Sequence, residues 1–460
     1  MAEVHEVLTA RVGDWRVAAY ACAYPAIGEI LGHAIEAEQD GLPFPASGSL
    51  RYLRLAQLRA LETYWYLRLV EHTPRIEQLY ASLFPGHRAR REAYGLTSKA
   101  LADMVEDETL EAVLARVASD EDFAHAHKLD ALRESLGLDY PSWILALAMG
   151  AGKTVLIGAI IATEFAMALE YADPDDERIQ FIENALVFAP GKTIIESLRE
   201  LARIRFERIL PPRLHKRFAA SLKLTFTRDG EKDIPVIRGS SFNLVVTNTE
   251  KIRIQARPVR RKAAGAYQLA ALLEQSSEEA NLRLRTIASL PHLAVFSDEA
   301  HHTYGHALGT QLKRVRQTVD YLAERSPNLI AVVNTTGTPY FERQPLKDVV
   351  FWYGLGQGIE DGILKEVRGG NIQAFPVGKD DAPDFVRHVV TDFITEYRDT
   401  ALPDGAKAKL AIYFPQTDDL EELRPVIELA LAESGLPPTI VLAHTSKTGA
   451  ESLAAFSTRA

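Results

Sequence analysis

The stretch Ala148-Met149-Gly150-Ala151-Gly152-Lys153-Thr154 decides the fold of this chain. It is rich in small residues, and it lies between the apolar run Trp143–Leu147 and the apolar stretch Val155–Ala168. This order predicts a buried β-strand, a tight loop and an α-helix. Glycines let backbone N–H groups turn toward a phosphate, and the N-terminus of the helix adds positive charge. We therefore expect a phosphate-binding loop.

The polar residues of the loop have separate predicted roles. Lys153 is expected to reach the β and γ phosphates of ATP, and the Thr154 hydroxyl to bind Mg²⁺. Leucine occupies position 147, where the complete glycine-rich pattern has glycine, so the loop has the form Ala-x-Gly-x-Gly-Lys-Thr. The predicted ATP-binding residues are Ala148, Gly150, Ala151, Gly152, Lys153 and Thr154. The alternative is a glycine turn with an exposed lysine.

A second apolar run, Leu293–Phe296, leads through Ser297 to the adjacent carboxylates of Asp298 and Glu299. In phosphoryl transfer, Asp298 would hold Mg²⁺, and Glu299 would orient and deprotonate the attacking water. With Lys153, these two form the predicted catalytic set. One alternative is a helix N-terminus stabilised by acidic residues. Another is a metal site made of Glu299, His302 and His306.

The pattern around these motifs predicts an α/β fold with a parallel sheet and helices on both faces. The first 140 residues look mostly helical, with apolar spacing in Leu53–Leu69 and Leu101–Val117. Short apolar runs then alternate with helical segments. A boundary is expected between Gly354 and Gly370, followed by a new sheet. The expected strands are Trp143–Leu147, Ala185–Phe188, Asn243–Val246, Leu293–Phe296, Leu329–Val333, Leu410–Phe414 and Thr439–Leu442.

Composition limits the kind of protein. The 460 residues carry 52 basic and 62 acidic side chains, a net charge of −10, so DNA contact would need a local basic groove. Cys22 is the single cysteine, which excludes intrachain disulfides and favours a reducing cytoplasm. The segment 1–17 has no uninterrupted apolar stretch of signal-peptide length. Lys153 and Glu164 interrupt the most apolar stretch, so no membrane span is expected.

Asp298-Glu299-Ala300-His301 is a DEAH box, and Thr336-Gly337-Thr338-Pro339 comes after the apolar run Leu329–Val333. With Lys153 and Thr154, in this order, they resemble superfamily 2 helicases. The doubled histidine and the Thr-Gly-Thr-Pro form resemble the restriction (Res) subunit of type III restriction enzymes, over residues 48–450. The resemblance implies a RecA-like P-loop NTPase lobe with a helical N-terminal region and a partial second RecA-like lobe. The implied domains are 1–47, 48–345 with a helical insertion at about 71–138, and 346–460.

The resemblance also implies roles for other residues. Gln57 would read adenine, since its amide offers a donor and an acceptor. The implied coupling residues are His301, Thr336 and Thr338, and the implied DNA contacts are Pro190, Thr247, Arg253 and Arg257. The stretch 253–262 has five positive charges and no acid, and either lines a DNA groove or forms a solvated loop. The same alternatives hold for Arg203, Arg205, Arg208, Arg213, Lys216 and Arg217.

Two motifs of such enzymes are absent from the sequence. The arginine motif of a second helicase lobe contains a Gly-Arg dipeptide, and this chain has none. It also has no Asp/Glu-x-Lys sequence, which is part of the restriction nuclease motif. We therefore expect a C-terminally truncated chain that binds ATP but hydrolyses it slowly alone. The predicted function is an ATP-dependent helicase or translocase acting on single- or double-stranded DNA, beside a DNA methyltransferase (modification) subunit. The alternatives are an ATP-binding DNA clamp or regulatory NTPase and, less favoured, a nuclease.

Overall fold

The computed structural model divides the chain into two compact units, Met1–Glu366 and Val367–Ala460. It describes residues 3–36, 49–172, 179–189, 198–227, 234–248, 252, 282–298, 309–326, 329–341, 344–365, 381–400, 408–414, 416–437 and 441. The division after Glu366 falls between Gly354 and Gly370, where the glycines predicted a boundary, and beyond residue 345, where the resemblance placed the end of the first lobe. The reason is a strand that the sequence did not predict, β9 (Val349–Tyr353), which pairs with β1 (Ser142–Leu147).

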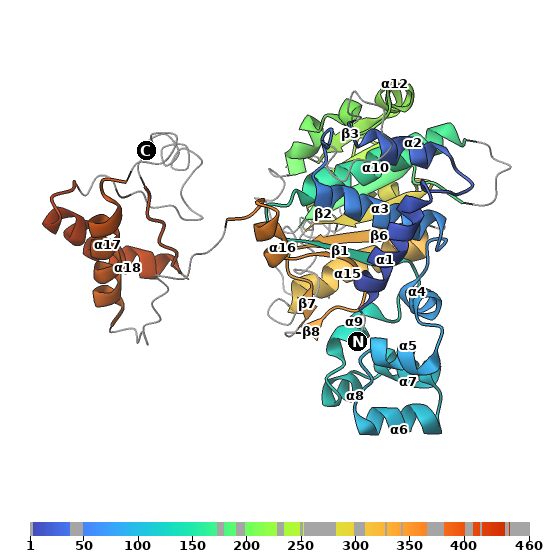
Figure 1. Cartoon of the computed structure of the whole chain (residues 1–460), viewed down its shortest axis with the longest axis horizontal. Helices are drawn as coiled ribbons and strands as arrows, with labels where there is room; N and C mark the ends of the chain where they lie inside the picture. Colours follow the sequence, from blue (N-terminus) through green and yellow to red (C-terminus); the bar gives the residue numbers. More distant parts are fainter. Residues whose placement is uncertain are drawn as a thin grey trace, which may run out of the picture. The chain divides into compact units, whose positions relative to one another are not determined.

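The first unit contains a seven-stranded sheet in the order β3-β4-β2-β5-β6-β1-β9. Figure 1 labels β3, β2, β6 and β1 of this sheet. Every neighbouring pair is parallel, which confirms the predicted parallel α/β sheet. The five strands predicted between residues 143 and 333 are all present. With β1 and β9, the sheet contains β2 (Asn184–Ala189), β3 (Lys223–Phe226), β4 (Asn243–Asn248), β5 (Leu293–Ser297) and β6 (Leu329–Thr336).

Helices cover both faces of this sheet. Along β2, Ala185 and Val187 lie in the core that contains α10 (Lys153–Glu170), whereas Leu186 and Phe188 lie in the core that contains α15 (Gly309–Arg325). Successive side chains of a strand point to opposite faces, so this division places one core on each face. Strands buried on both faces are apolar throughout, which is why the apolar runs predicted them.

The described part of the first 140 residues is helical, as predicted. The expected helix Leu101–Val117 is two helices, α6 and α7, because Thr109 begins a new one: its hydroxyl accepts a hydrogen bond from the backbone N–H of Ala112 (3.1 Å). The helices before β1 are α1 (Val4–Val17), α2 (Ala26–His33), α3 (Leu55–Leu69), α4 (Ile76–Leu83), α5 (His87–Ala93), α6 (Lys99–Asp107), α7 (Leu110–Ser119), α8 (Glu121–Ala126) and α9 (Asp130–Ser135).

Shorter elements complete the first unit. A two-stranded antiparallel ribbon of β7 and β8 follows β6. Among the described helices, none is long and apolar enough to cross a bilayer. The remaining elements are η1 (Arg199–Arg203), η2 (Phe206–Arg208), α12 (Pro212–Ser221), β7 (Tyr340–Phe341), β8 (Gln344–Pro345) and α16 (Leu355–Glu360).

The described part of the second unit consists of α17 (Ala382–Tyr397) and α18 (Thr417–Glu433), which share one apolar core. Leu410, Ile412 and Phe414 pack against that core as alternate residues of one segment. The sequence predicted that this segment is a strand of a sheet. Among the described residues of this unit it is not paired with any other strand. Most of the other predicted strand, 439–442, lies outside the described residues.

One buried carboxylate should make the stability of the first unit depend on pH. Asp348, immediately before β9, is 0% exposed and accepts a hydrogen bond from the Ser135 hydroxyl (2.9 Å). Its other oxygen, Oδ2, has no hydrogen-bond partner in the described structure. Burial raises the pKa of Asp348 from 3.8 to about 6. The protonated form is therefore favoured in the folded state, and stability is lost as pH rises through this range.

We expect the free energy of unfolding of Asp348→Asn, relative to that of the original chain, to increase steadily between pH 4 and pH 7. The pKa difference, 6 − 3.8 = 2.2, corresponds to about 3 kcal/mol across this window. Denaturant unfolding of both proteins at several pH values measures the difference. Asp139→Asn, at an exposed aspartate, controls for loss of one carboxylate. A difference that does not change with pH would contradict the assignment.

Candidate nucleotide-binding site

The topology brings three predicted motifs to one edge of the sheet. In parallel strands the carboxyl ends share an edge. The loop 148–152 follows β1, Asp298 follows β5, and Thr336 is the last residue of β6. Strand β6 lies between β1 and β5, with Ala146 opposite Thr336 and Ser297 opposite Asn334. Ligands of open α/β sheets bind outside this carboxyl edge. The order of strands therefore makes one candidate site from residues up to 188 positions apart.

The loop needs its glycines for conformation and for space. Gly150 has φ +79° and Gly152 has φ +87°, values that residues with a Cβ rarely adopt. A Cβ at position 152 would also lie 2.2 Å from Nε2 of Gln57. Gly152 is the N-cap of α10, so the chain turns from loop into helix at this residue.

Lys153 and Thr154 begin α10, and each is 8% exposed. The first amides of an α-helix have no carbonyl within the helix to bond, and they carry the positive end of its dipole. Nearly all of α10 behind them is buried, from Leu156 to Ala168, which holds this helix end in place. Two glycines with positive φ, outward-facing amides and a lysine suit a chain of phosphates.

Asp298 lies just after β5 and is held by two bonds. Its backbone N–H donates to the carbonyl of Phe188 in β2 (3.0 Å), and its Oδ1 accepts from the Thr335 hydroxyl (2.8 Å). The residue is 5% exposed. Carboxylate and hydroxyl oxygens are the ligands that Mg²⁺ prefers, so Asp298 and Thr154 have the right chemistry for this ion.

Thr336 and Thr338, the predicted coupling residues, lie at the same edge. The Thr336 hydroxyl is buried and accepts from the backbone N–H of Thr338 (3.1 Å), whereas Thr338 is exposed. Met149 of the loop lies over the turn between them, because a Cβ on Gly337 would be 3.5 Å from Met149. The loop and the end of β6 are therefore in direct contact.

Gln57 contacts the loop itself, a position that the sequence did not specify. Its Nε2 donates to the carbonyl of Gly152 (2.9 Å), and its Oε1 accepts from the backbone N–H of Arg54 (2.8 Å). The Arg54 guanidinium donates to the carbonyl of Gly150 (2.6 Å). Arg54 was not predicted as a site residue, and no local pattern in the sequence distinguishes it. The contact depends on where α3 packs.

On another side, the loop contacts the end of β9 and the turn after α16. Leu364 lies against Gly150, 3.5 Å from where its Cβ would be. The backbone N–H of Ala148 donates to the carbonyl of Tyr353 (2.9 Å). Burial, together with its bond to Asp361 (2.8 Å), raises the pKa of Tyr353 to about 12, so this hydroxyl stays protonated at neutral pH.

Several predicted residues lie outside the described part of the chain: Glu299, His301, Pro190, Arg253 and Arg257, with His302 and His306 of the alternative metal site. Among the described residues, no three His, Cys, Asp or Glu side chains gather as a metal site. Thr247 is described, but its side chain is fully buried at the end of β4 and bonded to Thr227 (2.9 Å). Its hydroxyl therefore faces another threonine and not the solvent.

The second basic segment forms ion pairs within the protein. Arg208 of η2 pairs with Glu36 (3.1 Å), and Arg213 of α12 pairs with Glu29 of α2 (2.8 Å). Glu170, at the end of α10, pairs with both Arg213 (2.6 Å) and Arg217 (2.9 Å). The segment is thus neither a solvated loop nor a row of unpaired charges, because Arg213 and Arg217 attach α12 to α2 and α10.

Comparison of the chain with models of protein families and with curated protein sequences finds no match. The class of protein is thus defined by the fold and the site alone: an α/β unit with a seven-stranded parallel sheet and a glycine-rich loop at its carboxyl edge.

Proposed function

We propose that this chain binds Mg²⁺ and ATP at the carboxyl edge of the sheet and hydrolyses the nucleotide. The observation that carries the proposal is the meeting of two distant motifs. The loop 148–152 leads into Lys153 and Thr154, and Asp298 follows β5, one strand beyond β6. A glycine loop alone is a weak signal, but a helix N-terminus, a lysine and a carboxylate at one edge form a phosphoryl-transfer site.

In this proposal each residue has one task. The amides at the start of α10 and the Lys153 ammonium bind the phosphates, while Thr154 and Asp298 hold Mg²⁺. Magnesium supplies charge neutralisation on the phosphate oxygens. Glu299, next in the chain, orients the attacking water and accepts its proton. Gln57 and Arg54 hold the loop. Both ends of the Gln57 amide are bonded within the protein, which favours this role over the reading of adenine.

The proposed use of this hydrolysis is movement on DNA, in a helicase or translocase core of the RecA-like type. This step is supported by the resemblance of the motifs to the restriction subunit of type III enzymes. The basic stretch 253–262 begins five residues after the end of β4, and its charges would supply the proposed DNA groove. A modification methyltransferase is the proposed partner.

The test combines nucleotide binding with turnover. Mg²⁺-ATP affinity and steady-state hydrolysis are measured for the chain alone, with single-stranded DNA and with double-stranded DNA. We expect micromolar-range binding, slow hydrolysis and a rise of turnover with one form of DNA. Binding of both ligands without stimulation would favour the ATP-binding clamp. No detectable ATP binding would overturn the proposal.

A further inference from the structure

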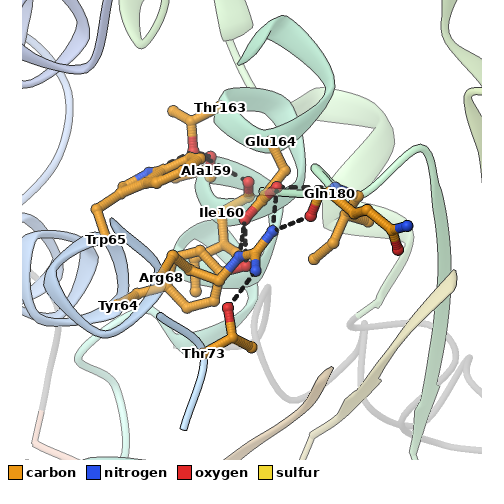
Figure 2. Close-up of polar contacts among 10 residues, drawn as sticks. Tyr64, Trp65, Arg68, Thr73, Ala159, Ile160, Thr163, Glu164 and Gln180 are labelled. Atoms are coloured by element: carbon orange, nitrogen blue, oxygen red, sulfur yellow. Dashed lines mark hydrogen bonds and ion pairs between the residues drawn. The ribbon is translucent and has the colours of Figure 1, made fainter. Parts of the chain in front are cut away.

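A buried ion pair joins α3 to α10 away from the phosphate loop (Figure 2). Arg68 Nε lies 2.7 Å from Glu164 Oε1, and the two side chains are 2% and 0% exposed. The hydroxyl of Tyr64 donates to the same oxygen (2.6 Å). The backbone N–H of Ile182 donates to the other oxygen (2.9 Å). Three donors, two from α3 and one from the segment before β2, therefore meet at the Glu164 carboxylate.

The guanidinium of Arg68 is also bound on its far side. It donates to the Thr73 hydroxyl (2.5 Å) and to the carbonyl of Gln180 (2.7 Å), which precedes β2. Desolvation makes a buried ion pair weak evidence for stability, but its directional bonds specify one arrangement. With the bond from Trp65 Nε1 to the Thr163 hydroxyl (3.0 Å), this network ties α3 to α10.

The network has nearly the same spacing from the loop on both helices. From Gln57 to Arg68 is 68 − 57 = 11 residues along α3, and from Gly152, whose carbonyl Gln57 binds, to Glu164 is 164 − 152 = 12 residues along α10. At about 1.5 Å per residue, these distances are about 16 and 18 Å. The two helices thus run in the same direction, tied at one end by Gln57 and Gly152 and at the other by the ion pair.

We propose that Arg68 and Glu164 are positioning residues for the phosphate loop. By fixing the register of α3 on α10, they keep Gln57 and Arg54 on the carbonyls of Gly152 and Gly150. A slide of one residue, about 1.5 Å, would break both short bonds. Because the C=O and N–H of a planar trans peptide point in opposite directions, holding the Gly152 carbonyl also directs the Lys153 amide. The nucleotide part of this inference rests on the proposed function.

The test variant is Arg68→Met with Glu164→Gln. It removes the pair without leaving a buried charge alone, and glutamine keeps an acceptor for Tyr64 and Ile182. The matched control is Arg16→Met with Glu62→Gln. Glu62 is also a fully buried carboxylate of α3. It pairs with Arg16 of α1 (2.6 Å) and with Arg59 of α3 itself (2.9 Å), and neither partner lies on α10. Gln57→Ala shows the effect of losing the loop contact directly.

The first readout is hydrogen exchange of the amides at 150–156 in the nucleotide-free protein, which does not depend on ATP use. We expect exchange to rise about tenfold in the Arg68/Glu164 variant and in Gln57→Ala, but not in the α1 control. The second readout separates binding from chemistry. The Kd for Mg²⁺-ATP should rise about tenfold, while the single-turnover rate at saturation changes less than about threefold.

The outcomes separate the two proposals. Normal loop exchange in a folded Arg68/Glu164 variant overturns the positioning role, whatever the ATP result. Equal loosening by the α1 control does the same, because it would reflect general destabilisation. If the original chain binds no ATP, the proposed function fails, but the exchange comparison still decides the positioning role. Should the double variant not fold, Arg68→Lys replaces it, and its loss of the two-pronged contact should raise exchange by a smaller factor.

Discussion

Replacing Lys153 by alanine is expected to abolish ATP hydrolysis and to weaken ATP binding. The side chain is at the first turn of α10, beside two loop glycines with positive φ. Its loss removes the positive charge for the β and γ phosphates, which should cost about 3 kcal/mol or more in the transition state, or at least about 100-fold in rate. Single-turnover hydrolysis and ATP titration measure the two effects.

Alanine is the strongest helix former, so α10 should still begin at position 153 in this variant. Lys347→Ala is the control. This lysine belongs to the same unit, precedes Asp348 and β9 in the chain, and pairs with Glu3 (3.5 Å). It should leave nucleotide binding unchanged. Hydrolysis by Lys153→Ala at the original rate would show that the loop is only a glycine turn.

Asp298→Asn is expected to stop hydrolysis through loss of Mg²⁺. Asparagine keeps an oxygen that accepts from the Thr335 hydroxyl (2.8 Å), so the end of β5 should stay in place while the negative charge disappears. We expect the single-turnover rate to fall by about 10²-fold to 10³-fold, because the metal neutralises charge on the phosphates. The Mg²⁺ concentration needed for half-maximal rate should rise.

Asp320→Asn provides a matched control. Asp320 in α15 also accepts a hydrogen bond from a side-chain hydroxyl, that of Tyr140 (2.8 Å), but Tyr140 precedes β1 and so lies at the amino edge of the sheet.

ATP affinity in the presence of EDTA should be unchanged by Asp298→Asn. An unaltered Mg²⁺ requirement in this variant would remove Asp298 from the proposed metal site.

Local patterns in the sequence predicted most of the buried strands of the first unit and its helical first part, but not β9. Apolar runs predicted the buried strands from β1 to β6 except β3, whose four residues include Lys223 and Thr225. The glycine pattern predicted the loop, and the apolar stretch Val155–Ala168 predicted α10, which begins two residues earlier at Lys153. Both succeed because a strand covered on two faces must be apolar and a tight turn must contain residues without a Cβ. The break between α6 and α7 was missed because Thr109 acts as a cap only in one backbone conformation.

Only the tertiary structure decided which distant residues meet. Strand order places β6 between β1 and β5 and brings β9 into the first sheet. The packing of α3 puts Gln57 on Gly152 and buries Arg68 against Glu164, and the packing of α12 pairs Arg213 with Glu29 and Glu170. Charged and amide side chains look the same in sequence whether they face solvent or a partner. Their partners are chosen by the packing of whole helices on the sheet, a long-range effect that residue spacing does not contain.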